Sequence, residues 1–415
     1  MNFKKTIVGL FILLGLTFCS WWLTLDKETR GLLKTVPTNR DLLFWTQAQR
    51  DAAFRALDRL PILAKAHDIP AGNTPSPLPN GPELKLPIDI DQYMAGQRSA
   101  ALIILQDGKV RFEKYRLDFD KQGRWTSFSV AKSFTATLIG AAIQDGYINS
   151  MDDKVSQYIP EMKGSAYDDV SIRQLMTMTS GVQWNEHYND KNSDVAKFMD
   201  HQPEKGVDTF ISYMRQLPRK NPAGELWHYS TGETNLVGAL LEKATKKPLA
   251  QYLSEKVWIP LGMEQKGTWL LNKTGLEISG CCIQAAARDY ARFGQFILDG
   301  AMINGQSILP EGWLKEATSK RVSITAKELA ELGIEKREDL FEKDLGYGYF
   351  WWIYSDGSYG AQGIFGQGIF IDPQRKLVIV SNADWDKAND QQSSDARTTF
   401  YQAVQKAVDA ETNKN

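Results

Sequence analysis

The chain is poor in the residues that form disulfide frameworks and metal sites. Its 415 residues include only three cysteines and four histidines. Cys281 and Cys282 are adjacent, and adjacent cysteines rarely bridge each other, so we expect them to pack as small apolar side chains. The four histidines show no metal-ligand spacing. The sequence therefore predicts no metal ion and no other cofactor.

An excess of charge of either sign is also absent. Lysine and arginine number 49, against 50 aspartates and glutamates. The chain has no basic tract and no basic stretch interleaved with aromatic residues, which are the features that nucleic-acid-binding proteins use. Nucleic acid is therefore not an expected partner. The sequence indicates no particular oligomeric state.

Long apolar runs are absent except at the amino terminus. Two lysines there precede the uncharged residues 6–25, a run long enough to cross a bilayer. We expect residues 1–26 to form a transmembrane anchor in the bacterial inner membrane, with the rest of the chain in the periplasm. Cleavage followed by secretion is one alternative. A lipoprotein attached through Cys19 is another, although Phe18 is bulky for the position before such a cysteine.

The segments that follow differ in composition. Residues 27–94 form an extension, which is predicted to be helical over Asp41–Leu60 and resembles a spacer over 69–88, where proline and glycine are dense. Residues 95–412 have the periodic patterns of a folded domain. A charge-rich stretch within it, Lys320–Lys343, is typical of a surface insert, either a lid or a solvated helix.

Strand patterns lie at both ends of this domain. At its start, Ala100–Leu105 and Val110–Tyr115 flank an Asp-Gly turn, which predicts a β-hairpin. Strands are also expected near its end, before a closing helix: Tyr347–Tyr354, Ile364–Asp372 and Leu377–Asn382, then Asp395–Ala410. The region from about 150 to 320 is mostly helical. We therefore expect an α+β fold, in which an antiparallel sheet formed from the N- and C-terminal parts is flanked by helices and carries an inserted, mostly helical lobe.

A serine and a lysine stand where a strongly helical stretch begins. Lys132 follows Ser129 by three residues, and residues three apart share a helix face. A lysine helps to deprotonate a hydroxyl only if its pKa is lowered, and burial and the positive end of a helix dipole both lower it. Taken alone, this pair favours a helix cap beside a solvated lysine.

Further motifs follow in a fixed order. They are LMTMTSGV at Leu175–Val182, Tyr229-Ser230 ahead of Leu236-Val237-Gly238, and AQGIFGQ at Ala361–Gln367. Together with Ser129-x-x-Lys132, they resemble the serine β-lactamase and penicillin-binding-protein-like hydrolases, on the class C and esterase side. The chain is most similar to the 6-aminohexanoate-dimer hydrolase branch, from about residue 95 to 410. The resemblance implies a β-lactamase/transpeptidase-like fold and a serine hydrolase that acts on a small-molecule ester or amide.

The resemblance also implies roles for individual residues. Ser129 stands where the family has its acylated nucleophile, Lys132 where it has the lysine that shuttles the proton, and Tyr229 where it has the partner acid and base. Tyrosine becomes a usable base only beside a positive charge, which Lys132 would supply. The backbone N–H groups of Ser129 and Ile364 would form the oxyanion hole. Three further residues are candidates for substrate contact: His187, Tyr188 and Gly363.

Two departures from the family pattern bear on the substrate. Position 231 is threonine where β-lactamases have asparagine, and position 361 is alanine where they have lysine or histidine. A cation at 361 would hold a substrate carboxylate, so its absence favours esters or small amides that lack one. The alternatives are a penicillin-binding, peptidoglycan-peptide or weak β-lactamase activity, and a non-catalytic binding protein with the same fold. A Ser-His-Asp hydrolase is disfavoured, because no G-x-S-x-G elbow occurs.

Overall fold

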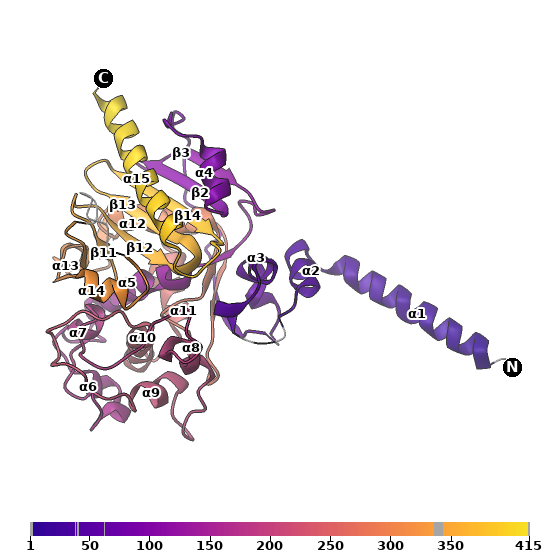
Figure 1. The fold of residues 1–415 in the computed structure, drawn as a ribbon, viewed down its shortest axis with the longest axis horizontal. Coiled ribbons are helices and arrows are strands. Elements are labelled where there is room, and N and C mark those ends of the chain that lie inside the picture. Colours follow the sequence, from indigo (N-terminus) through magenta and orange to yellow (C-terminus); the bar gives the residue numbers. More distant parts are fainter. Residues whose placement is uncertain (1–2, 38, 40, 62, 336–342, 414–415) are drawn as a thin grey trace.

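Figure 1 shows a computed structural model of the chain, with a body made of a sheet and a helical lobe and with the amino-terminal helix projecting from it. The structure describes all residues except 1–2, 38, 40, 62, 336–342 and 414–415. Within the first helix, side chains are described from Leu13 onward.

The central sheet is built from both ends of the folded domain, as the sequence predicts. In the described part of the chain it has eight antiparallel strands, in the order β3-β2-β14-β13-β12-β11-β10-β9. Their bounds are β2 Ser99–Gln106, β3 Lys109–Tyr115, β9 Val322–Ser323, β10 Gly346–Tyr347, β11 Trp352–Ile353, β12 Tyr359–Gly363, β13 Gln367–Asp372 and β14 Leu377–Ala383.

The β2–β3 hairpin forms where it was predicted, whereas another predicted strand is divided in two, and turns in the backbone explain both outcomes. Asp107 and Gly108 both have positive φ, at 50° and 72°, so the predicted β2–β3 hairpin closes with a two-residue turn that suits its twist. The single strand expected over Tyr347–Tyr354 is instead two short strands. Phe350, with φ of 58°, lies in the turn between them.

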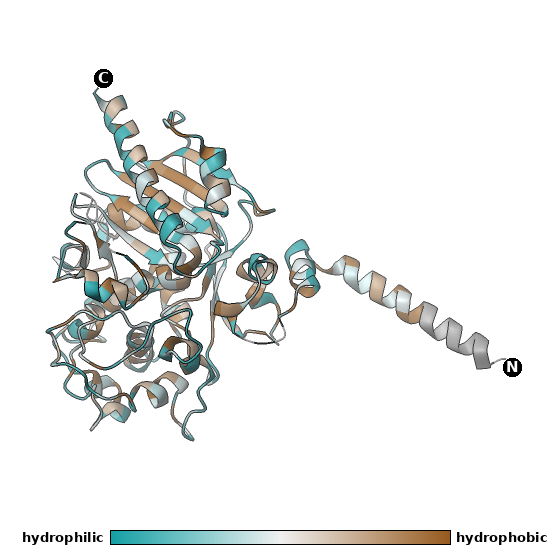
Figure 2. Ribbon diagram, in the orientation of Figure 1, coloured by the Kyte–Doolittle hydropathy of each residue, from teal (hydrophilic) through white to brown (hydrophobic). Residues whose placement is uncertain are grey.

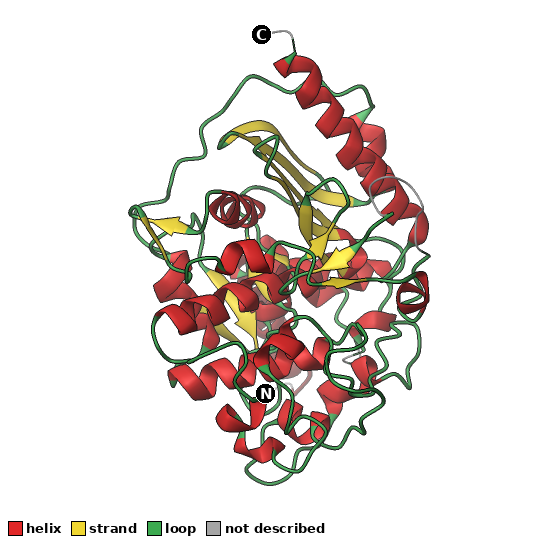
Figure 3. Ribbon diagram, turned by 90° about the vertical axis from the view of Figure 1, so that its left-hand side faces the viewer, coloured by secondary structure: helices red, strands yellow, loops and turns green. Residues whose placement is uncertain are grey.

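Both faces of the sheet are covered by helices, as Figure 3 shows. On one face lies α12 (Ala287–Leu298), where a Cβ on Gly294 would come within 2.6 Å of Val378, so only glycine permits this approach. On the other lies α15 (Gln391–Thr412), whose Tyr401 ring stacks on Phe370 with centroids 4.4 Å apart. Figure 2 shows the hydrophobic colour along the central strands between them. The α+β class is thus confirmed.

Two smaller sheets complete the strands. One has the order β1-β5-β6-β4 and the other pairs β7 with β8. Their bounds are β1 Ala66–Ile69, β4 Trp125–Thr126, β5 Gly267–Leu270, β6 Ile283–Ala285, β7 Met302–Ile303 and β8 Gln306–Ser307. Because β1 belongs to the extension and pairs with β5, the extension is joined to the folded domain by a strand ladder.

The helical lobe and its neighbours hold the side chains of the predicted site. The helix that carries Lys132 is α5 (Ala131–Gln144), preceded by the 3-10 turn η3 (Phe128–Val130). The other helices and turns are α4 Ile90–Gly96, α6 Val155–Tyr158, η4 Pro160–Met162, α7 Ile172–Met176, α8 Asp194–Lys197, η5 Phe198–Asp200, α9 Thr209–Met214, α10 Thr231–Thr245, α11 Leu249–Leu253, the π-helical turn η6 Ser254–Trp258, α13 Trp313–Ala317, α14 Ala326–Ala330 and η7 Ile364–Gly366.

The extension differs from the expected single helix over Asp41–Leu60. It contains η1 (Leu42–Phe44), α3 (Gln47–Ala56) and η2 (Leu57–Arg59). Thr46 interrupts the helix because it caps α3 in a reciprocal capping box with Gln49. The predicted insert over Lys320–Lys343 holds β9 and α14, and its residues 336–342 lie outside the described part.

The amino terminus begins with α1 (Phe3–Thr24) and α2 (Lys27–Lys34). In the part of the chain whose residues are described, no helix is long and apolar enough to cross a membrane. The expected transmembrane helix is therefore not found there.

Candidate active site

Ser129 lies at the point where η3 runs into α5, close to its predicted position at a helix start. The preceding residue, Phe128, has φ of 42°, a left-handed conformation that bulky residues rarely adopt. Strain of this kind persists where the surrounding packing holds it, and it is common at functional sites. Ser129 itself is buried, and it lines both of the cavities described below.

The Lys132 ammonium group is surrounded by three acceptors. Its Nζ lies 3.0 Å from Ser129 Oγ, 2.9 Å from Thr231 Oγ1 and 2.8 Å from the Gly280 carbonyl oxygen. Burial lowers the pKa of Lys132 to about 7, although the nearby Glu186 carboxylate acts in the opposite direction. With a neutral amine, Lys132 would donate hydrogen bonds to Thr231 Oγ1 and to the Gly280 carbonyl oxygen, and it would accept a hydrogen bond from the Ser129 hydroxyl. The interpretation of Lys132 as a solvated lysine, which the Ser129-x-x-Lys132 motif favours when taken alone, is therefore wrong, because Lys132 is buried.

Tyr229 lies beside Ser129 and Lys132 as predicted, but its pKa differs from expectation. It is buried and hydrogen bonded to Ser129, and Lys132 Nζ lies 5.1 Å from the centroid of its ring. Burial and then the charge of Glu186 raise the pKa of Tyr229 well above its usual value, and the Ser129 bond offsets only part of this. Tyr229 is therefore protonated at neutral pH, so its hydroxyl can donate a proton but is a poor initial base.

A buried carboxylate that the sequence analysis missed lies behind these three residues. Glu186 Oε2 accepts the backbone N–H of Thr231 at 2.9 Å, and Glu186 Oε1 accepts the Tyr188 hydroxyl at 2.7 Å and the Thr231 hydroxyl. Trp184 Nε1 donates to the same carboxylate. Position 231 therefore links Glu186 to Lys132. The sequence held only an indirect signal, since Glu186 follows the LMTMTSGV motif by four residues.

The two segments predicted to form the oxyanion hole lie against each other. Gly363 ends β12, and a Cβ there would lie 2.8 Å from the Ser127 carbonyl oxygen and 3.0 Å from Phe128 Cβ. Only glycine allows this approach, which brings Ile364 beside Ser129. Phe365 follows with φ of 60°, so a left-handed residue adjoins each of the two predicted backbone donors.

Two cavities meet at Ser129 and Ile364. The larger has a volume of about 520 Å³ and is also lined by Thr231 and Gly280. The smaller has a volume of about 60 Å³ and is lined by Tyr229 and by the predicted contact residues Tyr188 and Gly363. The third candidate, His187, lines neither of these two cavities.

The small cavity is lined by a cationic side chain that was not predicted. Arg397, from α15, lines it and donates from Nη2 to Gln362 Oε1 at 2.7 Å. Ala361 is buried on β12, beside Gln362. A positive charge is therefore present near the third family motif even though position 361 carries none.

The adjacent cysteines also differ from expectation, because Cys281 and Cys282 form a disulfide. Both line the large cavity, next to the Gly280 carbonyl that accepts from Lys132. In the described part of the chain, no group of three His, Cys, Asp or Glu side chains is arranged to hold a metal ion.

A comparison with protein families finds a match over most of the chain. The model of the β-lactamase family matches residues 89–403. The chain belongs to the β-lactamase family. It is accordingly a hydrolase, as the order of its motifs predicts.

Individual relatives agree with this assignment. The chain is 27% identical over 330 residues to a 6-aminohexanoate-dimer hydrolase of Paenarthrobacter ureafaciens, across 78% of this chain and 82% of that protein. Among solved structures it is similar to a candidate 6-aminohexanoate-dimer hydrolase from Bacillus anthracis, with a TM-score of 0.73, 21% identity, and coverage of 88% and 95% of the two chains. A family VIII carboxylesterase has a TM-score of 0.57 at 15% identity, with coverage of 77% and 96%. These structures share the fold.

Proposed function

We propose that the protein hydrolyses an ester or small amide through an acyl-enzyme on Ser129. The observation that carries this proposal is the contact between Lys132 Nζ and Ser129 Oγ, 3.0 Å apart, with a lysine pKa lowered to about 7. A general base whose pKa lies near the operating pH is the most effective at moving a proton. A buried lysine that served only as a structural ion would be paired directly with a carboxylate.

The chemistry follows from this pair. Neutral Lys132 takes the hydroxyl proton as Ser129 Oγ bonds to the substrate carbonyl carbon, and the N–H groups of Ser129 and Ile364 stabilise the oxygen that becomes negative. Tyr229 donates its proton to the leaving oxygen or nitrogen as the bond to the carbonyl breaks, and it regains a proton from Lys132. Water then attacks the ester of Ser129, gives one proton to the same groups, and releases the acid and the free serine.

The substrate class rests on the residues at positions 361 and 397. Alanine at 361 provides no cation for a carboxylate next to the scissile bond, which favours simple esters and small amides. Arg397 supports a second candidate, acylation by a penicillin-type substrate, because it places a cation in the small cavity. Labelling of Ser129 by a fluorescent penicillin supports this second activity, and absence of labelling at high concentration removes it.

The decisive experiment compares the full-length protein with Ser129→Ala in hydrolysis of short-chain p-nitrophenyl esters. We expect kcat/KM to fall at least roughly a thousandfold, because loss of a catalytic nucleophile has effects of this size or larger. Ser307→Ala, an exposed serine on β8, is the matched control and should keep full activity. Unchanged turnover in Ser129→Ala would exclude the mechanism. A fluorophosphonate adduct on the wild type, detected by mass, separates an enzyme from a binding protein with the same fold.

We also propose that residues 1–26 attach the chain to the bacterial inner membrane with the folded domain in the periplasm. Two lysines followed by twenty uncharged residues support this. Fractionation of the full-length chain and of residues 27–415 tests it. Recovery of the full-length chain in the soluble cytoplasmic fraction would contradict the proposal.

A further inference from the structure

We propose that the 520 Å³ cavity beside Ser129 binds the apolar acyl chain of the substrate, and that the amino-terminal extension forms its outer wall. The inference rests on the proposed acyl-enzyme function and names the substrate class: esters or amides with a long apolar acyl group and a small leaving group. The volume lies within the range of pockets that bury most of a small ligand.

The position of Tyr229 decides which part of the substrate occupies which cavity. Ser129 and Ile364 line both cavities, so the carbonyl group under attack lies where the two meet. Tyr229, the proton donor to the leaving group, lines only the small cavity. The leaving group therefore occupies the 60 Å³ cavity, and the acyl chain has only the larger one in which to extend.

The lining of the large cavity has the chemistry of an acyl-chain site. Its apolar side chains come from η1, from the α8–η5 segment and from the end of β5, for example Leu43, Met199 and Leu270. Among the described residues of its lining, the charged side chains are all exposed at the protein surface, where they form a rim around the cavity: Asp41, Lys65, Lys191, Asp200 and Lys273. An apolar chain loses contact with water inside such a site at no cost in unpaired charge.

The extension closes this cavity by bridging to the helical lobe. Lys191 Nζ lies 5.1 Å from the centroid of the Phe44 ring, so η1 is in contact with the loop that leads to α8. Lys273 Nζ lies 3.5 Å from Asp200 Oδ1 at the same rim. Without η1, the cavity would be an open groove on the lobe.

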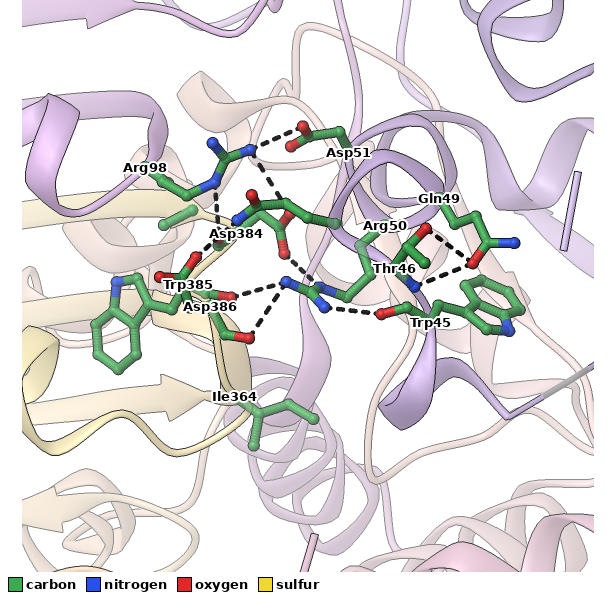
Figure 4. Close-up of polar contacts among 12 residues, drawn as sticks. Trp45, Thr46, Gln49, Arg50, Asp51, Arg98, Ile364, Asp384, Trp385 and Asp386 are labelled. Atoms are coloured by element: carbon green, nitrogen blue, oxygen red, sulfur yellow. Dashed lines mark hydrogen bonds and ion pairs between the residues drawn. The ribbon is translucent and has the colours of Figure 1, made fainter. Parts of the chain in front are cut away.

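Arg50 fixes the wall to the catalytic domain, as Figure 4 shows. Its Nη1 donates to the carbonyl oxygen of Trp45 at 2.9 Å, directly after η1. Its Nε donates to Asp384 Oδ1 at 2.7 Å and its Nη2 to the Trp385 carbonyl oxygen at 3.1 Å, both just after β14. The guanidinium also lies 4.7 Å from the centroid of the Phe365 ring, beside Ile364. The wall and the oxyanion segment are therefore held by one side chain.

The test measures kcat/KM of the full-length protein for ethyl esters, which have a small leaving group, from acetate to dodecanoate. Each methylene that becomes buried should raise kcat/KM by up to about fourfold until the cavity is full. Ala196→Trp, which fills the cavity from α8, should lower kcat/KM for the long esters at least tenfold and leave the acetate ester within about twofold. Leu43→Asp, which places a carboxylate in the wall, should act in the same direction. Ala410→Trp, an exposed alanine on α15, should leave the whole series unchanged.

The outcomes separate this inference from the proposed function. If the wild type turns over acetate through Ser129 but shows no gain with chain length, the acyl-chain site is wrong and the hydrolase stands. If Leu43→Asp keeps the wild-type chain-length profile, the extension does not form the wall. If no ester is hydrolysed and Ser129 takes no fluorophosphonate, the proposed function itself fails. Retained acetate turnover shows in each variant that the protein is folded.

Discussion

Replacing Arg50 by methionine should detach the extension from the catalytic domain. Methionine keeps most of the length of the side chain and removes its charge and its five donors. The change leaves Asp384, whose side chain is fully buried, without its nearest partner at 2.7 Å. The next cation, Arg98 Nη2, is 4.0 Å from Asp384 Oδ2 and already donates to Asp51 at 2.8 Å. Arg98 is therefore a poor replacement.

The size of the effect follows from this burial. Breaking a buried ion pair by removing one partner costs about 3–5 kcal/mol, most of it from the charge left behind. Burial raises the pKa of Asp384, and Arg50 lowers it again. In Arg50→Met the folded-state pKa therefore rises further above the unfolded value. A carboxyl group with a raised folded-state pKa makes its full contribution to stability at pH values below its unfolded-state pKa. This contribution is lost as the pH rises through the folded-state pKa. The variant should accordingly be more destabilised at pH 8 than at pH 5.

Two measurements on the same protein test this reasoning. Urea unfolding followed by tryptophan fluorescence gives the free energy of unfolding at both pH values, and limited proteolysis reports whether residues 27–65 become accessible before the domain unfolds. The double variant Arg50→Met, Asp384→Asn is the control. It removes the stranded charge and should recover much of the lost stability.

Three results would refute the argument. A change of less than about 0.5 kcal/mol in Arg50→Met is within the range of an ordinary surface substitution and would show that the ion pair does not hold the extension. A destabilisation that is equal at pH 5 and pH 8 would show that Asp384 is not the stranded group. A double variant no more stable than Arg50→Met would assign the effect to the lost backbone contacts instead.

Two further predictions concern catalysis. Because the base must be neutral and burial lowers the pKa of Lys132 to about 7, kcat/KM for an acetate ester should fall roughly tenfold per pH unit below pH 7 and level off above it; a pH-independent profile between 5 and 8 would contradict this role. Gly363→Ala should lower kcat roughly a hundredfold with little change in KM, since its Cβ would meet the Ser127 carbonyl oxygen at 2.8 Å and push Ile364 away from the oxyanion position. Gly96→Ala, which meets no atom within 4 Å, is its control and should keep wild-type kinetics.

Short sequence patterns were sufficient to predict the helices and strands that are determined by residues close together in the chain. The β2–β3 hairpin follows from an Asp-Gly turn, and the helix after Ser129 follows from its composition. Both form where the sequence predicts them. Strand β14 was expected over Leu377–Asn382 and occupies Leu377–Ala383, because it begins with a continuous apolar run. The strand expected over Ile364–Asp372 begins only at Gln367, since Ile364–Gly366 form the 3-10 turn η7. The order of the family motifs then predicted which serine, lysine and tyrosine the fold brings together.

What was missed depends on contacts between distant segments. Arg50 and Asp384 are 334 positions apart, and no periodic pattern connects them. The burial of Glu186 depends on how the loop before α8 folds against Thr231, which the composition of that loop does not encode. The acidity of Tyr229 was misjudged for the same reason. The sequence shows a lysine that would lower its pKa, but burial and the Glu186 carboxylate, which raise it, become visible only in three dimensions.

The extension connects these observations to the origin of the substrate. Among the described residues, Asn39 is the first to line the large cavity, and only residues 25–38 separate it from the end of α1 at Thr24. If residues 1–26 bind the membrane as proposed, this short connection keeps the cavity near the bilayer surface, where molecules with apolar chains are concentrated. A soluble chain of residues 27–415 retains η1, Arg50 and the whole cavity. It should therefore keep its preference for long acyl chains in solution and lose only the added rate toward esters presented in vesicles.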